Sequence, residues 1–186
     1  MMSGTPDLDT RLLTIEEFAR LPDDGWRHEL VEGRVIREPY SGFQQGATAV
    51  NVGYVLHEFA RPRGLGRVVL GTGFVLWDAP PTVRGPDAAF VLQSRLDFDH
   101  SGFAPFAPDL TVEVLAPWNT MSEIHNKVLD YLDAGSQLVW VVDPELRTVT
   151  VYRSRREIQL LAEDDEIDGA DVLPGFRRRV AELFDS

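Results

Sequence analysis

Apolar residues recur along this chain at two spacings, one typical of short β-strands and one typical of amphipathic helices. The strand spacing predicts strands at 66–70, 73–77, 86–92, 110–115, 138–142 and 148–153. The runs at 86–92 and 110–115 are almost continuously apolar, as expected for central strands that are covered on both faces. A turn at Glu32-Gly33 between two alternating runs predicts a hairpin over 27–37.

Helix starts are predicted where Ser or Thr precedes Glu or Gln by three residues, a capping-box sequence found at Thr14, Ser41 and Thr120. The first helix should end near Leu21. The second should run to about Ala60, with an apolar face made of Phe43, Ala47, Val50 and Tyr54. The third should end at Gly135 with Tyr131 on its apolar side, and a short helix should close the chain.

The segments between these elements include a long loop at 93–107 and an acidic loop at 163–171. The order of elements predicts a single α/β domain with one central sheet. A length of 186 residues suits one domain that buries a core without disulfides or a structural metal.

Composition excludes several classes of protein. The chain has no Cys, which excludes disulfides, iron–sulfur clusters and thiol catalysis. It has no apolar run near the ~20 residues that span a bilayer, and its first residues lack the pattern of a signal peptide, so we expect a cytoplasmic protein without a membrane segment. The net charge of −12 argues against tight nonspecific binding of nucleic acid.

The 18 basic residues comprise many Arg and a single Lys, Lys127. Chance and a specific need for an amine are both open explanations of this imbalance.

Glu113 interrupts the apolar run at 110–115, and with Thr111 it alternates with Leu110, Val112 and Val114. A buried carboxylate costs free energy unless it is paired, hydrogen-bonded or bound to a metal. The alternation indicates a strand with one polar face, as in the wall of a cleft. The alternative is an edge strand from which Glu113 reaches water.

Two further residues are expected near Glu113. Glu113 should lie about 10 Å from the end of its strand, and Lys127 about 10 Å along the next helix. Because the connection at 117–119 is short, the helix should double back and bring Lys127 to the height of Glu113. Asp87 follows Pro86 at the start of the strand at 86–92, and Asp109 begins the strand of Glu113.

Carboxylates grouped with an amine suggest a hard cation with oxygen ligands, with Mg²⁺ as the first choice and Mn²⁺ as the second. Such an ion would activate water and stabilise charge on a phosphate, while Lys127 helps to orient the nucleophile. A purely structural salt bridge between Glu113 and Lys127 would give the same sequence.

These residues resemble the PD-(D/E)XK nuclease superfamily and, more closely, the bacterial Uma family of predicted endonucleases. The resemblance rests on the order and spacing of WRHELVEGRV (26–35), GFVL (73–76), GPDAAFV (85–91), APDLTVEVLAP (107–117), EIHNKVLDYLDAG (123–135), LVWVVDP (138–144) and LPGF (173–176). It implies one nuclease-like domain over 12–185, after a flexible lead at 1–11. It also implies a restriction-endonuclease-like core with a central mixed β-sheet flanked by helices.

The resemblance assigns Asp87 and Glu113 as the two metal-binding carboxylates, for Mg²⁺ or Mn²⁺. The general pattern has a Lys two residues after the second carboxylate, where this chain has Leu115. In the Uma family that Lys comes from the next helix, which matches Lys127 and favours a specific need for an amine. Arg, with its planar fork and higher pKa, would be a poor substitute there. Glu29 matches an acidic position that can join the site.

Two further residues depart from the family pattern. Gln45 stands where relatives commonly have His, and Ala116 stands where Ser is usual. Gln45 and Asp109 are expected to support the site, although Gln45 cannot titrate. Trp118, which precedes the Lys127 helix, is expected to pack against the helix start, with stacking on a base as the alternative.

The leading hypothesis is a Mg²⁺-dependent DNA endonuclease with catalytic residues Asp87, Glu113 and Lys127, weak metal-dependent DNA binding and a homodimeric state. A catalytically inactive binding protein that keeps the nuclease fold is the main alternative. A hydrolase of small phosphate esters is a third and weaker one.

Overall fold

The computed structural model describes residues 11–184, so nearly all of the lead expected at 1–11 lies outside the described residues. Its centre is a six-stranded mixed sheet with the strand order β10-β9-β8-β7-β6-β3. Strands β7 and β8 are parallel, and every other neighbouring pair in this sheet is antiparallel. The strands are β3 (Gly66–Leu70), β6 (Ala88–Leu92), β7 (Leu110–Val114), β8 (Leu138–Asp143), β9 (Thr148–Tyr152) and β10 (Ile158–Leu161).

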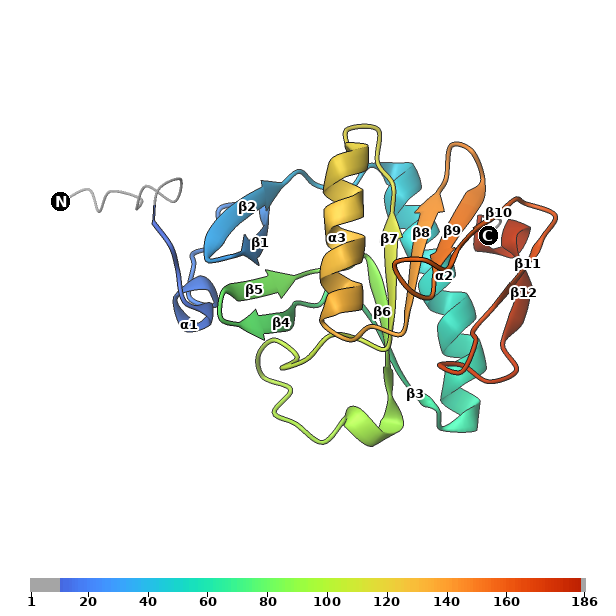
Figure 1. The fold of residues 1–186 in the computed structure, drawn as a ribbon, viewed down its shortest axis with the longest axis horizontal. Coiled ribbons are helices and arrows are strands. Elements are labelled where there is room, and N and C mark those ends of the chain that lie inside the picture. The colour runs from blue at the N-terminus through green and yellow to red at the C-terminus, as the bar shows by residue number, and fades with distance from the viewer. Residues whose placement is uncertain (1–10, 185–186) are drawn as a thin grey trace.

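Two long helices flank this sheet (Figure 1). Helix α2 (Phe43–Ala60) shares one apolar layer with the β7 residues Leu110, Val112 and Val114. Helix α3 (Met121–Asp133) connects the parallel strands β7 and β8 and shares the other layer with β8. Because successive strand residues point to opposite faces, the remaining β7 residues, Thr111 and Glu113, point toward the α3 side.

A second sheet of four strands, in the order β2-β1-β5-β4, lies beside the first. Its strands are β1 (Arg27–Val31), β2 (Arg34–Glu38), β4 (Phe74–Asp78) and β5 (Pro81–Arg84). Helix α1 (Ile15–Phe18) packs on it around a small core that includes Phe18, Leu30 and Val83. The chain runs from β5 through 85–87 directly into β6, so this short link joins the two sheets.

The C-terminal part differs from its prediction. The expected acidic loop contains strand β11 (Glu166–Asp168), which pairs with β12 (Arg177–Arg179) so that acidic and basic residues face each other across the ribbon. The last element within the described residues is a 3₁₀ turn, η3 (Val180–Leu183), and two more 3₁₀ turns occur at η1 (Arg61–Arg63) and η2 (Gln93–Arg95).

Most of the predicted strands are confirmed, but four strands were missed, namely β5, β10, β11 and β12. Strand β5 contains Pro81 and Arg84, which interrupt its apolar pattern, and Pro is tolerated there because it is the first residue of the strand. The expectation of one sheet was therefore incomplete.

The capping boxes at Thr14 and Thr120 are confirmed, whereas the one at Ser41 is wrong. Helix α2 has Gly42 as its N-cap and no side-chain cap. The apolar face predicted for α2 is also wrong, because its members Phe43, Ala47, Val50 and Tyr54 are exposed. The buried side is formed by Val52, Val55, Leu56 and Phe59.

None of the helices within residues 11–184 has the length and apolar character needed to cross a membrane. The domain boundaries at 12 and 185 stay a prediction.

Candidate active site

A polar cleft with a volume of about 340 Å³ opens where the two sheets meet. One wall is the β1–β2 hairpin, whose Arg27, Ile36 and Glu38 line the cleft. The other walls come from the β5–β6 link, the end of β7 and the first turns of α2 and α3. They contribute Arg84, Asp87, Glu113, Val114, Ser41, Gln45, Trp118, Asn119, Glu123, Asn126 and Lys127.

Glu113 lies near the end of β7 and is almost fully buried, with 4% of the residue exposed. The Tyr131 hydroxyl of α3 donates a 2.8 Å hydrogen bond to Glu113 Oε1. On the same face of β7, Thr111 makes a hydrogen bond with Ser136, just beyond α3. The polar side chains on this face of β7 are therefore hydrogen-bonded to Tyr131 and Ser136. The second carboxylate oxygen of Glu113, Oε2, remains for the cleft.

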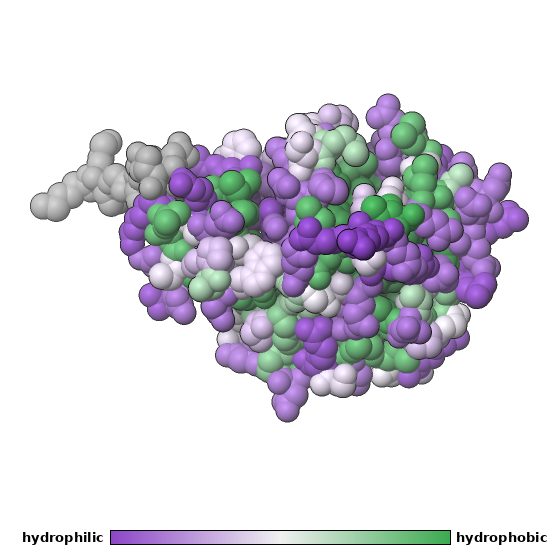
Figure 2. Space-filling view, viewed as in Figure 1, coloured by the Kyte–Doolittle hydropathy of each residue, from purple (hydrophilic) through white to green (hydrophobic). Residues whose placement is uncertain are grey.

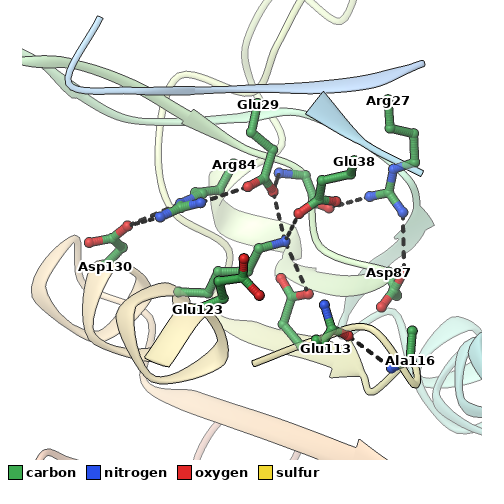
Figure 3. A network of polar contacts seen from close by, with 12 residues as sticks. Arg27, Glu29, Glu38, Arg84, Asp87, Glu113, Ala116, Glu123 and Asp130 are labelled. Carbon is green, nitrogen blue, oxygen red and sulfur yellow. Dashed lines mark hydrogen bonds and ion pairs between the residues drawn. The ribbon is translucent and has the colours of Figure 1, made fainter. Parts of the chain in front are cut away.

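Lys127 is buried beside Glu113, because α3 doubles back along the sheet. Its Nζ lies 3.6 Å from Glu113 Oε2, 3.2 Å from Glu29 Oε1 and 2.5 Å from Glu38 Oε1. Figure 3 shows these three carboxylates converging from three different strands. Through these ion pairs, the ammonium group of Lys127 connects α3 to both sheets.

The charges around Lys127 influence its own pKa and that of Glu113. Burial alone would lower the pKa of Lys127, but the charges of Glu113, Glu29 and Glu38 outweigh it and raise that pKa above its usual value. Burial raises the pKa of Glu113 to about 8, and the charges of Asp87 and Glu29 act in the same direction. Near neutral pH, the raised pKa of Glu113 therefore favours its protonated form, whereas the lowered pKa of Glu29 favours a carboxylate beside Lys127.

Glu29 lies behind the cleft and is 2% exposed. It accepts hydrogen bonds from Arg84 Nη1 at 2.7 Å and from the Gly85 N–H at 3.0 Å. Burial alone would raise the pKa of Glu29, but Lys127 and Arg84 bring it below its usual value. Arg84 also binds Asp130 of α3 at 2.5 Å, so a continuous chain of charges links β1, β5 and α3.

Asp87 is hydrogen-bonded to β7, the strand that carries Glu113. Its Oδ2 accepts a 2.8 Å hydrogen bond from the Val114 N–H, and its Oδ1 lies 3.2 Å from Arg27 Nη1. The other Arg27 nitrogen, Nη2, donates to the Gly85 carbonyl at 2.5 Å. One carboxylate oxygen of Asp87 is therefore held by β7 and the other by a cation of the hairpin.

Gln45, from the first turn of α2, reaches the same peptide segment. Its Nε2 donates to the Val114 carbonyl at 3.0 Å, which fixes the orientation of the amide. Its Oε1 is buried and has no hydrogen-bond partner in the described part of the chain. A buried oxygen without a donor is costly unless a ligand satisfies it.

Asp109 does not join this group, contrary to expectation. It precedes β7 at the end opposite Glu113 and binds Arg95 at 2.8 Å, the Leu92 N–H at 2.9 Å and Gln137 at 3.2 Å. The strand separates the two acids by about 13 Å at the usual rise per residue. Asp109 therefore stabilises the opposite end of the sheet.

Sequence reasoning missed four polar partners in this region, Arg27, Glu38, Arg84 and Tyr131. One signal for the first two was present, because Glu38 directly follows the predicted hairpin at 27–37, lies opposite Arg27 and carries the opposite charge. Arg84 lies in the missed strand β5, and Tyr131 matched the apolar pattern of its helix.

Comparison of the sequence with known protein families identifies a match. The family model Uma2, described as "Putative restriction endonuclease", matches residues 15–181, which is most of the chain. The chain belongs to the Uma2 family. No curated protein sequence matches this Uma2 chain.

A solved structure has the same fold as this Uma2 protein. It is described as a "putative nuclease belonging to DUF820" from Anabaena variabilis ATCC 29413. The TM-score is 0.81 at 25% sequence identity, and the match covers 92% of this chain and 97% of the other. The predicted α/β fold, with a central mixed sheet flanked by helices, is confirmed.

The donor atoms of the Uma2 cleft fit a hard divalent ion in part. Within residues 11–184, no three acidic or histidine side chains gather closely enough to form a metal site by themselves. Asp87 and Glu113 are two carboxylates on one wall, and the unpartnered Gln45 Oε1 and the Val114 carbonyl lie beside them as neutral oxygens. Oxygen donors of this kind are those that Mg²⁺ and Mn²⁺ prefer.

Proposed function

We propose that this Uma2 protein is a Mg²⁺-dependent endonuclease that hydrolyses phosphodiester bonds of DNA, with Mn²⁺ as an alternative ion. The observation that carries the proposal is the buried ammonium of Lys127, 3.6 Å from Glu113 in a cleft that Asp87 also lines. Membership of a family described as restriction endonucleases supports the same reaction class.

Asp87 and Glu113 would hold the ion, with Gln45 Oε1 and the Val114 carbonyl as further oxygen donors. When bound, such an ion lowers the pKa of water and stabilises negative charge on a phosphate. Arg27 now neutralises Asp87, so it has to give up part of that contact when a cation binds. Its guanidinium would then be available to a phosphate at the cleft mouth.

Lys127 would position the reacting groups. An ammonium has three N–H donors, and Glu29 and Glu38 hold it by two of them. The third donor points to the Glu113 side, where it would orient the attacking water or a phosphate oxygen. Tyr131 fixes the rotamer of Glu113 through its hydrogen bond, so one carboxylate oxygen stays directed at the same place.

Cleavage of supercoiled plasmid DNA tests this proposal. We expect nicking in Mg²⁺ or Mn²⁺, none with a chelator, and a loss of at least about 100-fold in Asp87→Asn, Glu113→Gln and Lys127→Ala. Asp133→Asn is the matched control, because Asp133 lies at the exposed end of α3, the helix that carries Lys127, and binds Arg155 on the surface.

Wild-type cleavage rates in folded Asp87→Asn and Lys127→Ala would contradict the assignment. Absence of cleavage and of metal binding in folded wild-type protein would favour a binding protein that keeps the nuclease fold.

Homodimerisation and a cytoplasmic location belong to the same proposal. A dimer would present two sites to the two strands of a duplex. Light scattering from the purified protein measures the mass in solution, and a monomer at all concentrations would remove this part of the proposal.

A further inference from the structure

Two exposed aromatic side chains, one in the cleft lining and one near it, have no role in the chemistry described above. Trp118 lines the cleft and is 46% exposed, although a Trp side chain gains much free energy from burial. Tyr40 is 70% exposed and does not itself line the cleft, although its neighbours Pro39 and Ser41 do. Its hydroxyl lies beside Gly25, 3.5 Å from the position of an added Cβ atom.

The two segments that carry these rings meet at the entrance. A Cβ atom added to Gly42 would lie 3.8 Å from Trp118 Cη2, so the indole ring lies against the backbone that follows Tyr40. Trp118 is adjacent to Asn119, whose side chain accepts a 2.8 Å hydrogen bond from the Ala116 N–H and fixes the turn between β7 and α3. Trp118 is thus attached to a hydrogen-bonded turn that follows the strand of Glu113, whereas the Tyr40 ring lies beside Gly25.

Without a bound metal ion, the arginines of the cleft offer little to a phosphate backbone. Arg84 is held by Glu29 and Asp130, and Arg27 is held by Asp87. Arg37, the remaining arginine of the cleft lining, lies 3.7 Å from Asp24. With a net charge of −12 on the whole chain, electrostatic attraction to a duplex is weak.

Stacking of bases on aromatic rings does not depend on that attraction. Each stacked base contributes about 1–3 kcal/mol in proteins that bind single strands. In a continuous duplex the bases are already stacked on each other, so a ring at the cleft mouth can reach only a base that is unpaired.

We propose that Trp118 and Tyr40 form a stacking platform for unpaired bases beside the bond that is cut. This inference rests on the proposed endonuclease function and names its substrate class as single-stranded DNA, or a single-stranded segment within a duplex.

Binding of fluorescent oligonucleotides without divalent ions tests the platform apart from catalysis. We expect single-stranded DNA to bind more tightly than the matched duplex. Trp118→Ala and Tyr40→Ala should each weaken single-strand binding by about 5- to 150-fold, the equivalent of one stacked base, while Trp118→Phe should keep most of it. Leu160→Ala is the control, since Leu160 is 67% exposed on the edge strand β10 and should bind as the wild type does.

Hydrolysis of methyl nitrophenyl phosphate in Mn²⁺ separates the two proposals, because this phosphodiester has no nucleobase to stack. Unchanged ester hydrolysis in Trp118→Ala, together with weaker single-strand binding, supports the platform. Single-strand binding that needs both rings, in a protein that hydrolyses nothing, supports the platform and contradicts the nuclease.

Three results would overturn the platform. The first is equal or tighter binding of the duplex. The second is wild-type single-strand affinity in both folded variants, Trp118→Ala and Tyr40→Ala. The third is weaker binding that is accompanied by a lower mass of the variants in light scattering, which would mean that these rings contact a second copy of the chain.

Discussion

At the scale of single residues, the site depends on one buried amine among carboxylates. Lys127 and Glu113 are both less than one tenth exposed, and each would be costly to bury without the other charges of the group. Glu113 is the member whose ionisation is most easily changed, because its surroundings raise its pKa to about 8.

The raised pKa of Glu113 predicts how stability changes with pH in the metal-free protein. The folded state keeps the Glu113 proton up to about pH 8, whereas the unfolded chain releases it near its ordinary pKa of 4.5. The stabilising contribution is thus complete below the unfolded pKa and is lost as pH rises through this window. The slope is at most about 1.4 kcal/mol per pH unit.

Urea unfolding between about pH 5 and pH 8, without divalent ions, measures this effect. Glu113→Gln keeps an acceptor for the Tyr131 hydroxyl but cannot titrate, so its free energy of unfolding should change less with pH. Parallel pH curves for the wild type and the variant would contradict the assigned pKa.

Two substitutions of Lys127 test separately the need for a positive charge and the need for an ammonium group at this position. Lys127→Ala leaves Glu29 and Glu38 short of one cation and should lower the free energy of unfolding by about 3–5 kcal/mol. Lys127→Arg should recover part of that loss but stay at least about 100-fold below the wild type in cleavage, because a planar fork cannot replace the ammonium. Unfolding and plasmid nicking measured on the same samples test this, and near-normal nicking by Lys127→Arg would refute it.

The sequence allowed Glu113 and Lys127 to be singled out because each departs from its surroundings. Glu113 breaks an apolar run, and Lys127 is the single Lys of the chain. The partners Glu38 and Arg84 carry no such signal, since charged residues in weak strands usually face water. Asp87 and Asp109 both follow a Pro, so the sequence does not distinguish them. The folded structure shows that Asp87 lies in the cleft and Asp109 at the opposite end of β7.

At the scale of elements, helix α3 matters most, since it links the parallel strands and carries both Lys127 and Tyr131. Its start is fixed by the capping box, in which the Thr120 side chain and the Glu123 side chain each bind the other's backbone N–H. The Glu123 side chain also lines the cleft.

Removal of this cap should cost stability without changing the fold. Thr120→Ala should lower the free energy of unfolding by about 0.5–2 kcal/mol. Ser122→Ala is the control, because Ser122 is exposed in the first turn of the same helix. Denaturant unfolding of both variants measures the difference, and an equal effect of the two substitutions would show that the cap contributes nothing.

Elements with strong local signals were predicted well, whereas those defined by tertiary packing were not. The central strands are largely apolar, and the cap at Thr120 is encoded within four residues. Helix α2 has apolar residues on several sides, so its periodicity could not show which side the sheet would cover. Strand β5 exists because β1 and β4 pair with it, which its own short sequence does not reveal.

At the scale of the whole molecule, the surface is acidic and its arginines are largely used within the protein. Arg153, Arg155 and Arg177 bind Asp168, Asp133 and Glu166, respectively. Hydrophilic residues surround scattered apolar ones on the face seen in Figure 2. A continuous cationic track for duplex DNA is therefore not expected on this molecule.

This distribution predicts weak DNA binding with a shallow salt dependence. A protein that neutralises few phosphates releases few counterions, so the logarithm of affinity should fall with the logarithm of salt concentration at a slope no steeper than about −3. Fluorescence anisotropy over a range of salt concentrations measures this slope. A slope near −8, which would require about nine phosphate contacts, would contradict the distribution of charge described above.

Calorimetric titration of the protein with Mn²⁺ in the absence of DNA tests the central claim, that the cleft holds a divalent ion on Asp87 and Glu113. We expect binding by the wild type and by Asp133→Asn, and its loss in Asp87→Asn and Glu113→Gln. No binding to folded wild-type protein at millimolar Mn²⁺, or undiminished binding by both cleft variants, would contradict the claim.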